Sequence, residues 1–337
     1  MPGVRLNFNK DSVGMSFGVP GARYTVNSKG RRTASVGIPG TGLYNVETLS
    51  SGRSKRSGGG NSKVAQAAVE SASGPPKPSL FAGKAEKELN AFLIDIYDPE
   101  STDDATSVIN KAVALREKFE DLRVPLELIS FLHGITDAKW KEKARGWGEG
   151  LWQNRGSVFA DPLVAKYFKG IHPQVRISPG ISSQLTYDAQ TLGFIWAEVL
   201  QGEKKFDEAL NVLSEMSPDQ MVAISIADIE IEKGDFDGAI ETTEDVEIFD
   251  DATAMLMVLR GVSFRGKGML EAAIECFKRV LKEKGLPEAL MHRALFERGV
   301  TYGQMGKKAM GIKDLERILV DDPNYPEVQE KLAELKK

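Results

Sequence analysis

The chain contains few of the residues that carry most active-site chemistry. Its 337 residues include one cysteine and three histidines. A single cysteine excludes a disulfide framework within the chain, and the place of Cys276 beside Phe277 in a helical pattern favours a buried, inert thiol. His133, His172 and His292 lie far apart and show no metal-ligand spacing. We therefore expect no catalytic residues, no metal and no cofactor, and hence a protein that is not an enzyme.

Long apolar runs are also missing. The run GFIWAEVL at residues 193–200 is far shorter than the roughly 18 residues that a membrane span requires. The N-terminus has no apolar segment of the kind found in secretory signal peptides. A composition with 41% hydrophobic and 27% charged residues fits a folded soluble protein. We expect the protein in the cytoplasm.

Charge is distributed unevenly, although the net charge is only −4. Residues 1–60 contain nine Lys or Arg and two acidic residues, whereas the rest of the chain contains 35 basic and 46 acidic residues. Segments of opposite charge favour two different kinds of partner. Attraction between the two segments, or a solvated turn and linker, would explain the same pattern. The candidate patch for an anionic partner consists of Lys29, Arg31, Arg32, Arg53, Lys55 and Arg56.

Residues 1–48 have the pattern of a small antiparallel β-domain. Five short segments rich in β-branched and aromatic residues are separated by Gly, Pro, Asn and Ser. In residues 13–19 and 33–38, apolar residues alternate with small or polar ones, which places each apolar set on one face of a strand.

The pattern Gly-x-Pro-Gly occurs twice in this region, at residues 18–21 and 37–40. A phosphate-binding loop requires a glycine-rich backbone leading into a helix, together with a Lys-Ser/Thr pair. The stretch GIPGTGLYNVE has neither. The Pro-Gly pairs instead fit the central positions of type II turns, so we predict two strand corners and no nucleotide site.

The stretch PGVRLNFNKDSVGMSFGVPGARYTVNSKGRRTASVGIPGTGLY also resembles a bacterial family catalogued as domain of unknown function 4236, over about residues 2–45. The resemblance implies that this segment is a folding unit. It implies no activity, because the family has none assigned.

Residues 49–79 are dominated by Ser, Gly and Pro and predict a flexible linker. The pattern becomes helical from Leu80, with Ser79 as the expected N-cap. Further helices are predicted at residues 102–119, 125–134, 137–153 and 184–201, with a break at 176–183. Residues 80–183 show no clear repeat phase and contain either diverged helical pairs or a separate helical cap.

Two stretches of this helical region resemble binding sites but have simpler interpretations. The acidic DPESTDDAT at residues 98–106 lacks the ligand alternation and glycine of a calcium loop, and predicts a loop followed by a helix N-cap. Trp140, Trp147 and Leu151 lie at helical spacing among basic residues. A buried stripe is favoured there over a surface that stacks on nucleic acid.

The C-terminal part repeats a pattern of small residues at equivalent positions of successive helical pairs. The first-helix positions are Ala197, Ala227, Gly261 and Gly299, and the second-helix positions are Ala209, Ala239, Ala273 and Gly311. The pattern resembles the tetratricopeptide repeat, a helix–turn–helix unit of about 34 residues, over about residues 190–325. Glu230 and Thr243 depart from it, and an unrelated bundle of α-hairpins is the alternative. A last helix at residues 327–337 is expected to cap the array.

The resemblance to tetratricopeptide repeats implies a concave groove lined by first-helix residues. These are Phe194, Glu198, Ile224, Asp228, Met255, Val262, Arg293 and Phe296. Apolar anchors with few charges fit a bound peptide or helix. The alternative is that several of these residues form the core between repeats.

We therefore predict a multidomain α+β protein. It has a small basic β-domain at residues 1–48, a flexible linker at 49–79, a helical region at 80–183 and an all-α repeat array at 184–337. The preferred function is a non-enzymatic adaptor or scaffold that binds a protein partner through the repeats and a second partner through the β-domain. The alternative is a nucleic-acid-binding protein that recognises nucleic acid through its basic domain and assembles through its repeats. An enzyme with a site near Asp95, Asp98 and His133 is the least favoured hypothesis.

Overall fold

The computed structural model describes the chain in two ways. It describes the backbone alone in the strands within residues 4–48 and 174–184. It describes backbone and side chains in residues 75–96, 98, 101, 103–135, 137–168, 185, 187–323, 325 and 327–337. The chain divides into two compact units, Met1–Arg176 with Ser183–Trp196, and Ile177–Ser182 with Ala197–Lys337.

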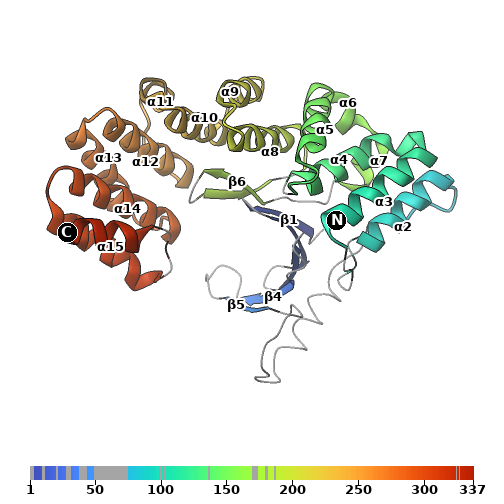
Figure 1. Cartoon of the computed structure of the whole chain (residues 1–337), viewed down its shortest axis with the longest axis horizontal. Helices are drawn as coiled ribbons and strands as arrows, with labels where there is room; N and C mark the ends of the chain where they lie inside the picture. Colours follow the sequence, from blue (N-terminus) through green and yellow to red (C-terminus); the bar gives the residue numbers. More distant parts are fainter. Residues whose placement is uncertain are drawn as a thin grey trace. The chain divides into compact units, whose positions relative to one another are not determined.

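The N-terminal backbone forms five strands that pair antiparallel in chain order (Figure 1). They are β1 (Val4–Asn9), β2 (Ser12–Val19), β3 (Ala22–Asn27), β4 (Arg32–Gly37) and β5 (Tyr44–Thr48). Val19 pairs with Ala22, so two residues connect β2 to β3. The Pro-Gly pairs and residues 49–74 lie outside the described residues. The turn types, the linker and a β-domain that folds by itself therefore stay predictions.

Two further strands follow the helices of the first unit. They are β6 (Gln174–Ser178) and β7 (Ile181–Gln184), and they interrupt the helical pattern at the predicted break. β6 lies parallel to β1, with Asn7 opposite Gln174.

The helices of the first unit pack around α4. They are α2 (Lys84–Ile96), α3 (Ala105–Lys118), the 3-10 turn η1 (Glu120–Leu122), α4 (Arg123–Gly134), α5 (Lys141–Gln153), α6 (Arg155–Ala160) and α7 (Pro162–Tyr167). α3, α5 and α7 all contact α4, whose Leu128, Ile129 and Phe131 are fully buried. Helices α3, α4 and α5 confirm the predicted helical segments. The predicted N-cap at Ser79 is wrong, because α2 begins at Lys84 and the Ser79 carbonyl instead accepts the N–H of Ala82 in a turn.

The acidic segment before α3 caps a helix, as the sequence predicts. The Asp104 carboxylate accepts the backbone N–H of Ser107 at 2.7 Å. Asp103 accepts the Ser107 hydroxyl and pairs with Lys111 at 2.6 Å. These contacts hold both carboxylates at the start of α3, where negative charge is stabilised by the helix dipole.

Of the predicted stripe, Trp140 at the start of α5 is buried and Trp147 within it is half-buried. Trp140 stacks on Trp147 with ring centroids 6.2 Å apart, and its indole N–H donates to the Thr106 hydroxyl at 3.1 Å. Leu151 is also buried. These contacts within the first unit explain why aromatic residues lie at this spacing. A surface that stacks on nucleic acid is not needed to explain it.

The C-terminal part consists of successive helical hairpins (Figure 1). The helices are α8 (Ala189–Gly202), α9 (Phe206–Ser214), α10 (Gln220–Lys233), α11 (Phe236–Thr242), α12 (Asp251–Gly266), α13 (Leu270–Lys282), α14 (Glu288–Gln304), α15 (Lys308–Asp321) and α16 (Val328–Lys336). They match the predicted pairs and the predicted last helix. The described helices contain no segment with the length and apolar character of a bilayer span.

Small residues allow the helices of each hairpin to approach closely. A Cβ built on Gly261 of α12 would lie 2.6 Å from the ring of Phe277 in α13, so only glycine fits there. Ala209, Ala239 and Ala273 are likewise fully buried. The last hairpin and α16 share one apolar cluster, which is formed by Leu295, Phe296, Leu315, Ile318, Val328 and Leu332.

The second hairpin keeps its fold despite its departures from the repeat pattern. Glu230 of α10 accepts a hydrogen bond from the Thr242 hydroxyl of α11 at 2.9 Å, and burial raises the pKa of its carboxyl. The Thr243 hydroxyl donates to the Ala239 carbonyl at 2.7 Å. The polar side chains are thus satisfied within the hairpin.

Candidate functional site

The first helices of the repeats form a continuous stack in the second unit. α10 packs against α12, and α12 packs against α14. The second helices follow alongside, with α11 against α12 and α13 against α14. Side chains at equivalent positions of α10, α12 and α14 are therefore brought near one another, as a shared binding surface requires.

The eight predicted groove residues divide by polarity. Phe194, Ile224, Met255, Val262 and Phe296 are buried, whereas Glu198, Asp228 and Arg293 are half-buried. Ile224 and Met255 have no exposed surface at all. These two occupy the core between repeats, which is the alternative interpretation of their positions. A partner-binding role for the set as a whole stays a prediction.

Asp228 takes part in polar contacts between two successive first helices. Gln201 at the end of α8 donates to Asp228 at 3.1 Å and to Glu232 at 2.8 Å, both on α10. These bonds join α8 to α10 on the surface side of the stack. Asp228 is therefore held in a defined position, which reduces the entropy lost if it contacts a partner.

A buried carboxylate joins α12 to α14 in the same manner. Glu297 pairs with Arg265 of α12 at 2.5 Å and with Arg293 of its own helix at 2.7 Å. The Glu297 side chain is only 4% exposed. Removal of either arginine leaves a buried charge less well compensated, and the pair with Arg265 links the two helices.

The other candidate chemical groups are two histidines and the single cysteine. His133 of α4 is half-buried, and desolvation lowers its pKa to about 4, so the imidazole is neutral at pH 7. Cys276 of α13 is a buried free thiol whose pKa is raised by burial. A raised pKa suppresses the reactive thiolate. His172 lies outside the described residues.

The structure brings together one group that the sequence analysis missed. The side chains of Glu288, His292 and Asp321 converge, with their ligand atoms all within 4.8 Å of one another. Asp321 is 29 residues from His292, so no local motif links them. The available signal was the spacing of Glu288 and His292, which lie one helical turn apart.

Only one of the six residues of the basic patch lies in the described part of the chain. Arg32 begins β4, and Lys29, Arg31, Arg53, Lys55 and Arg56 lie outside the described residues. The patch therefore stays a prediction.

Comparison with known families identifies the N-terminal segment. Residues 1–46 match the family described as a protein of unknown function (DUF4236). This confirms the resemblance read from the sequence. No curated protein matches the chain.

Comparison with solved structures identifies the helical fold. The N-terminal domain of the EccA1 ATPase from the ESX-1 secretion system of Mycobacterium tuberculosis is similar, with a TM-score of 0.57 and 13% identity. The match covers 76% of this chain and 92% of that one. At this identity the likeness concerns the fold alone.

Two repeat-containing structures match with lower TM-scores. A tetratricopeptide repeat protein from Parabacteroides merdae ATCC 43184 has a TM-score of 0.37 and 13% identity, covering 76% of this chain and 100% of that one. A chain of the Cut9–Hcn1 hetero-tetramer of the APC/C has a TM-score of 0.38 and 12% identity, covering 75% of this chain and 52% of that one. The C-terminal helical region is tetratricopeptide-like in fold.

Proposed function

We propose that the protein is a non-enzymatic adaptor that binds a protein partner through the stacked first helices of its repeats. The observation that carries this proposal is the stack itself. Its helices α10, α12 and α14 pack in succession, and the ion pair of the buried Glu297 with Arg265 links the last two. A rigid, preformed surface loses little conformational entropy when a partner binds.

The charge of this surface favours a basic helix or extended peptide as the partner segment. Half-buried acidic side chains at Glu198 and Asp228 flank buried apolar residues. A partner segment with basic side chains would complement these two acidic side chains. The fold occurs in EccA1 as one domain of an ATPase, which agrees with a docking role beside another functional module.

The proposal assigns no catalytic role to His133 or Cys276. Desolvation lowers the pKa of His133 to about 4 and keeps its imidazole neutral at pH 7. Burial of Cys276 raises its pKa and lowers its nucleophilicity.

The basic N-terminal segment supplies the second binding module of the proposal. Residues 1–60 carry nine basic and two acidic side chains, and residues 4–48 contain five strands. We propose that these strands form a β-domain, tethered by residues 49–79, that binds an anionic partner in the cytoplasm. Such binding through Lys and Arg would weaken steeply as salt rises.

Affinity capture of the full-length chain from native cells, with and without nuclease, tests the adaptor function. We expect the same partner proteins to be retained after nuclease treatment. The double variant Glu198→Lys with Asp228→Lys should lose them, because it reverses charge on the first helices.

A matched control variant distinguishes an effect at the first-helix surface from a general effect of charge reversal. Glu208→Lys with Glu241→Lys makes the same change at exposed positions of the second helices α9 and α11, and should retain the partners. Equal loss in both double variants would refute the first-helix surface. Loss of all partners on nuclease treatment would instead favour nucleic-acid bridging through the basic domain.

A further inference from the structure

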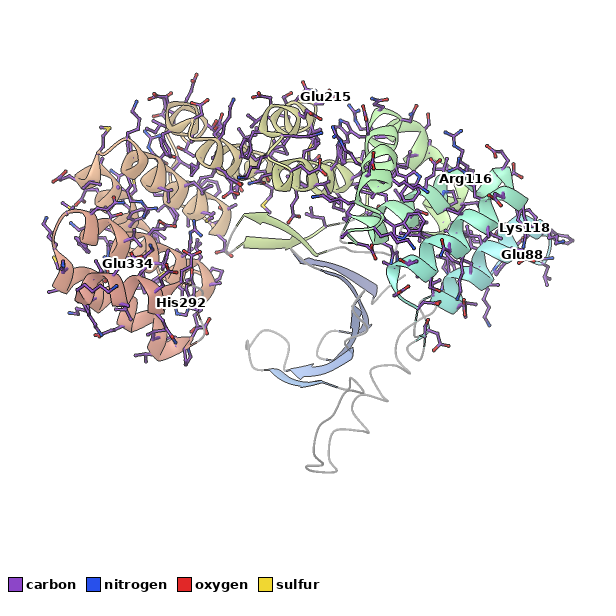
Figure 2. The ribbon with its side chains drawn as sticks, viewed as in Figure 1. Glu88, Arg116, Lys118, Glu215, His292 and Glu334 are labelled. Carbon is purple, nitrogen blue, oxygen red and sulfur yellow. The ribbon has the colours of Figure 1, made fainter. Side chains whose placement is uncertain are left out.

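We propose that Glu288, His292 and Asp321 form a binding site for one divalent transition-metal ion, with Zn²⁺ the best fit. The site lies where the first turn of α14 meets the end of α15, and His292 is labelled there in Figure 2. This inference is independent of the proposed protein-binding surface.

The distances fit metal ligands better than they fit a hydrogen bond. Asp321 Oδ2 lies 3.3 Å from His292 Nε2, and Glu288 Oε1 lies 3.8 Å from the same nitrogen. Charge-assisted N–H···O⁻ bonds are usually about 2.7–2.9 Å long, and one ring N–H points well at only one acceptor. Two ligands bound about 2.0–2.1 Å from a tetrahedral zinc ion stand about 3.4 Å apart. The three ligand atoms all lie within 4.8 Å of one another, so side-chain rotations of the carboxylates would bring them to this spacing.

The backbone positions of the three ligands are firmly held. Glu288 and His292 share one face of α14 at a spacing of four residues, and Asp321 is the last residue of α15. The antiparallel hairpin brings the beginning of α14 beside the end of α15, and these two helices pack closely along their length. A site on two packed helices is better preorganised than a site on loops.

The histidine ring is also oriented by its surroundings. His292 is only 5% exposed, and the Tyr325 ring packs edge-on against it with centroids 6.0 Å apart. Tyr325 in turn contacts Phe296. This packing restrains the imidazole and directs Nε2 toward the two carboxylates.

The two carboxylates leave the site open to solvent. The side chains of Glu288 and Asp321 are 72% and 45% exposed. An ion can therefore enter without opening the fold, and water can occupy the fourth position of a three-ligand site.

The ligand set selects the class of ion. One imidazole with two carboxylates suits zinc and its first-row neighbours such as cobalt. Mg²⁺ and Ca²⁺ prefer oxygen ligands alone. A bound ion would join the start of α14 to the end of α15, and so would stabilise the last hairpin of the array.

Metal titration of the full-length, untagged protein tests the site. We expect ZnCl₂ to bind with a stoichiometry of one ion per chain in calorimetry and to raise the Tm in a concentration-dependent manner. CoCl₂ should give visible d–d absorption, and MgCl₂ should give no heat of binding at the same concentration. His292→Gln should abolish zinc and cobalt binding, whereas Glu288→Gln and Asp321→Asn should each weaken it at least tenfold.

Controls separate the site from other metal binding and from misfolding. Glu316→Gln removes an exposed carboxylate from the same hairpin and should leave zinc affinity unchanged. Glu288→Gln alters a side chain that is mostly exposed, so it tests the site even if His292→Gln does not fold. The proposal is overturned if zinc does not bind, if Glu288→Gln binds zinc like the unmodified protein, or if a folded His292→Gln variant keeps its affinity.

Discussion

Gly299 of α14 and Gly311 of α15 bring the backbones of the last hairpin into direct proximity. A Cβ built on Gly311 would lie 2.7 Å from the carbonyl oxygen of Gly299, and a Cβ on Gly299 would lie 3.2 Å from that of Gly311. Backbone atoms of packed helices move less readily than side chains. The repeat pattern of small residues therefore reflects a steric requirement at this crossing.

Substitution of Gly311 by alanine should destabilise the protein. The added methyl group forces α14 and α15 apart, and overpacking of this kind costs about 1–3 kcal/mol. The matched control is Gly146→Ala in α5, where a Cβ meets no atom within 4 Å. This control should gain about 0.5–1 kcal/mol, because alanine is the better helix former. Urea unfolding of both variants measures the difference, and a stabilised Gly311→Ala variant would contradict the steric argument.

Loss of the ion pair between Arg298 and Asp314 should weaken the same hairpin. The Arg298 guanidinium donates through Nε and Nη2 to both Asp314 oxygens, each at 2.7 Å. The two side chains are only 19% and 10% exposed, so Asp314→Asn leaves a poorly solvated cation with a weaker partner. We expect a loss of about 1–3 kcal/mol in the free energy of unfolding.

The ion pair between Glu316 of α15 and Lys336 of α16 is the comparison for that measurement. Glu316 pairs with Lys336 at 3.0 Å, but both side chains are more than half exposed. Glu316→Gln should change the free energy of unfolding by less than about 1 kcal/mol. Equal effects of Asp314→Asn and Glu316→Gln would show that burial does not set the strength of the first pair.

Stability should fall on mild acidification because of His133. Burial lowers the pKa of this imidazole to about 4, and the weak field of Asp103 offsets only part of the shift. The unfolded chain binds a proton near pH 6.5, so the stability contributed by the neutral ring is present above that pH and is lost as the pH falls toward 4. We expect a loss of about 2 kcal/mol between pH 7 and pH 5.

Variants at two histidines assign this pH dependence. His133→Leu should flatten the dependence of the free energy of unfolding between pH 7 and pH 5, whereas His292→Gln should keep most of it. Urea denaturation at four pH values gives the comparison. A His133→Leu variant with the same slope as the unmodified protein would place the responsible group elsewhere.

Cys276 should react slowly with thiol reagents in the native protein. The thiol is buried in α13, and burial raises its pKa, so both access and thiolate fraction are low. Labelling with Ellman's reagent at pH 8 should be at least tenfold slower in buffer than in 6 M guanidinium, where burial is lost. Equal rates would show that the thiol is accessible in the folded chain.

Most helices could be predicted from the sequence, because the apolar spacing that specifies a helix extends over only a few residues. The apolar spacing of residues 102–153 and 184–321 predicted α3 to α5 and the helices from α8 onward. Ser79 failed as a cap because Asn90 binds the Pro76 carbonyl and a turn follows at Ser79, so α2 begins five residues later. Glu230 and Thr243 weakened the prediction of the second hairpin, since a sequence pattern cannot show that these polar groups find partners within it.

The sequence by itself determined the order of helical hairpins and the family of residues 1–46, because helical periodicity, caps and turn residues act over a few positions. Tertiary structure alone decided which distant polar groups meet. Glu288, His292 and Asp321 converge, and Arg265 reaches Glu297, only because the helices that carry them are packed at small side chains such as Gly261 and Gly299. Contacts across 29 or more residues depend on helix crossing and register, which no local pattern encodes.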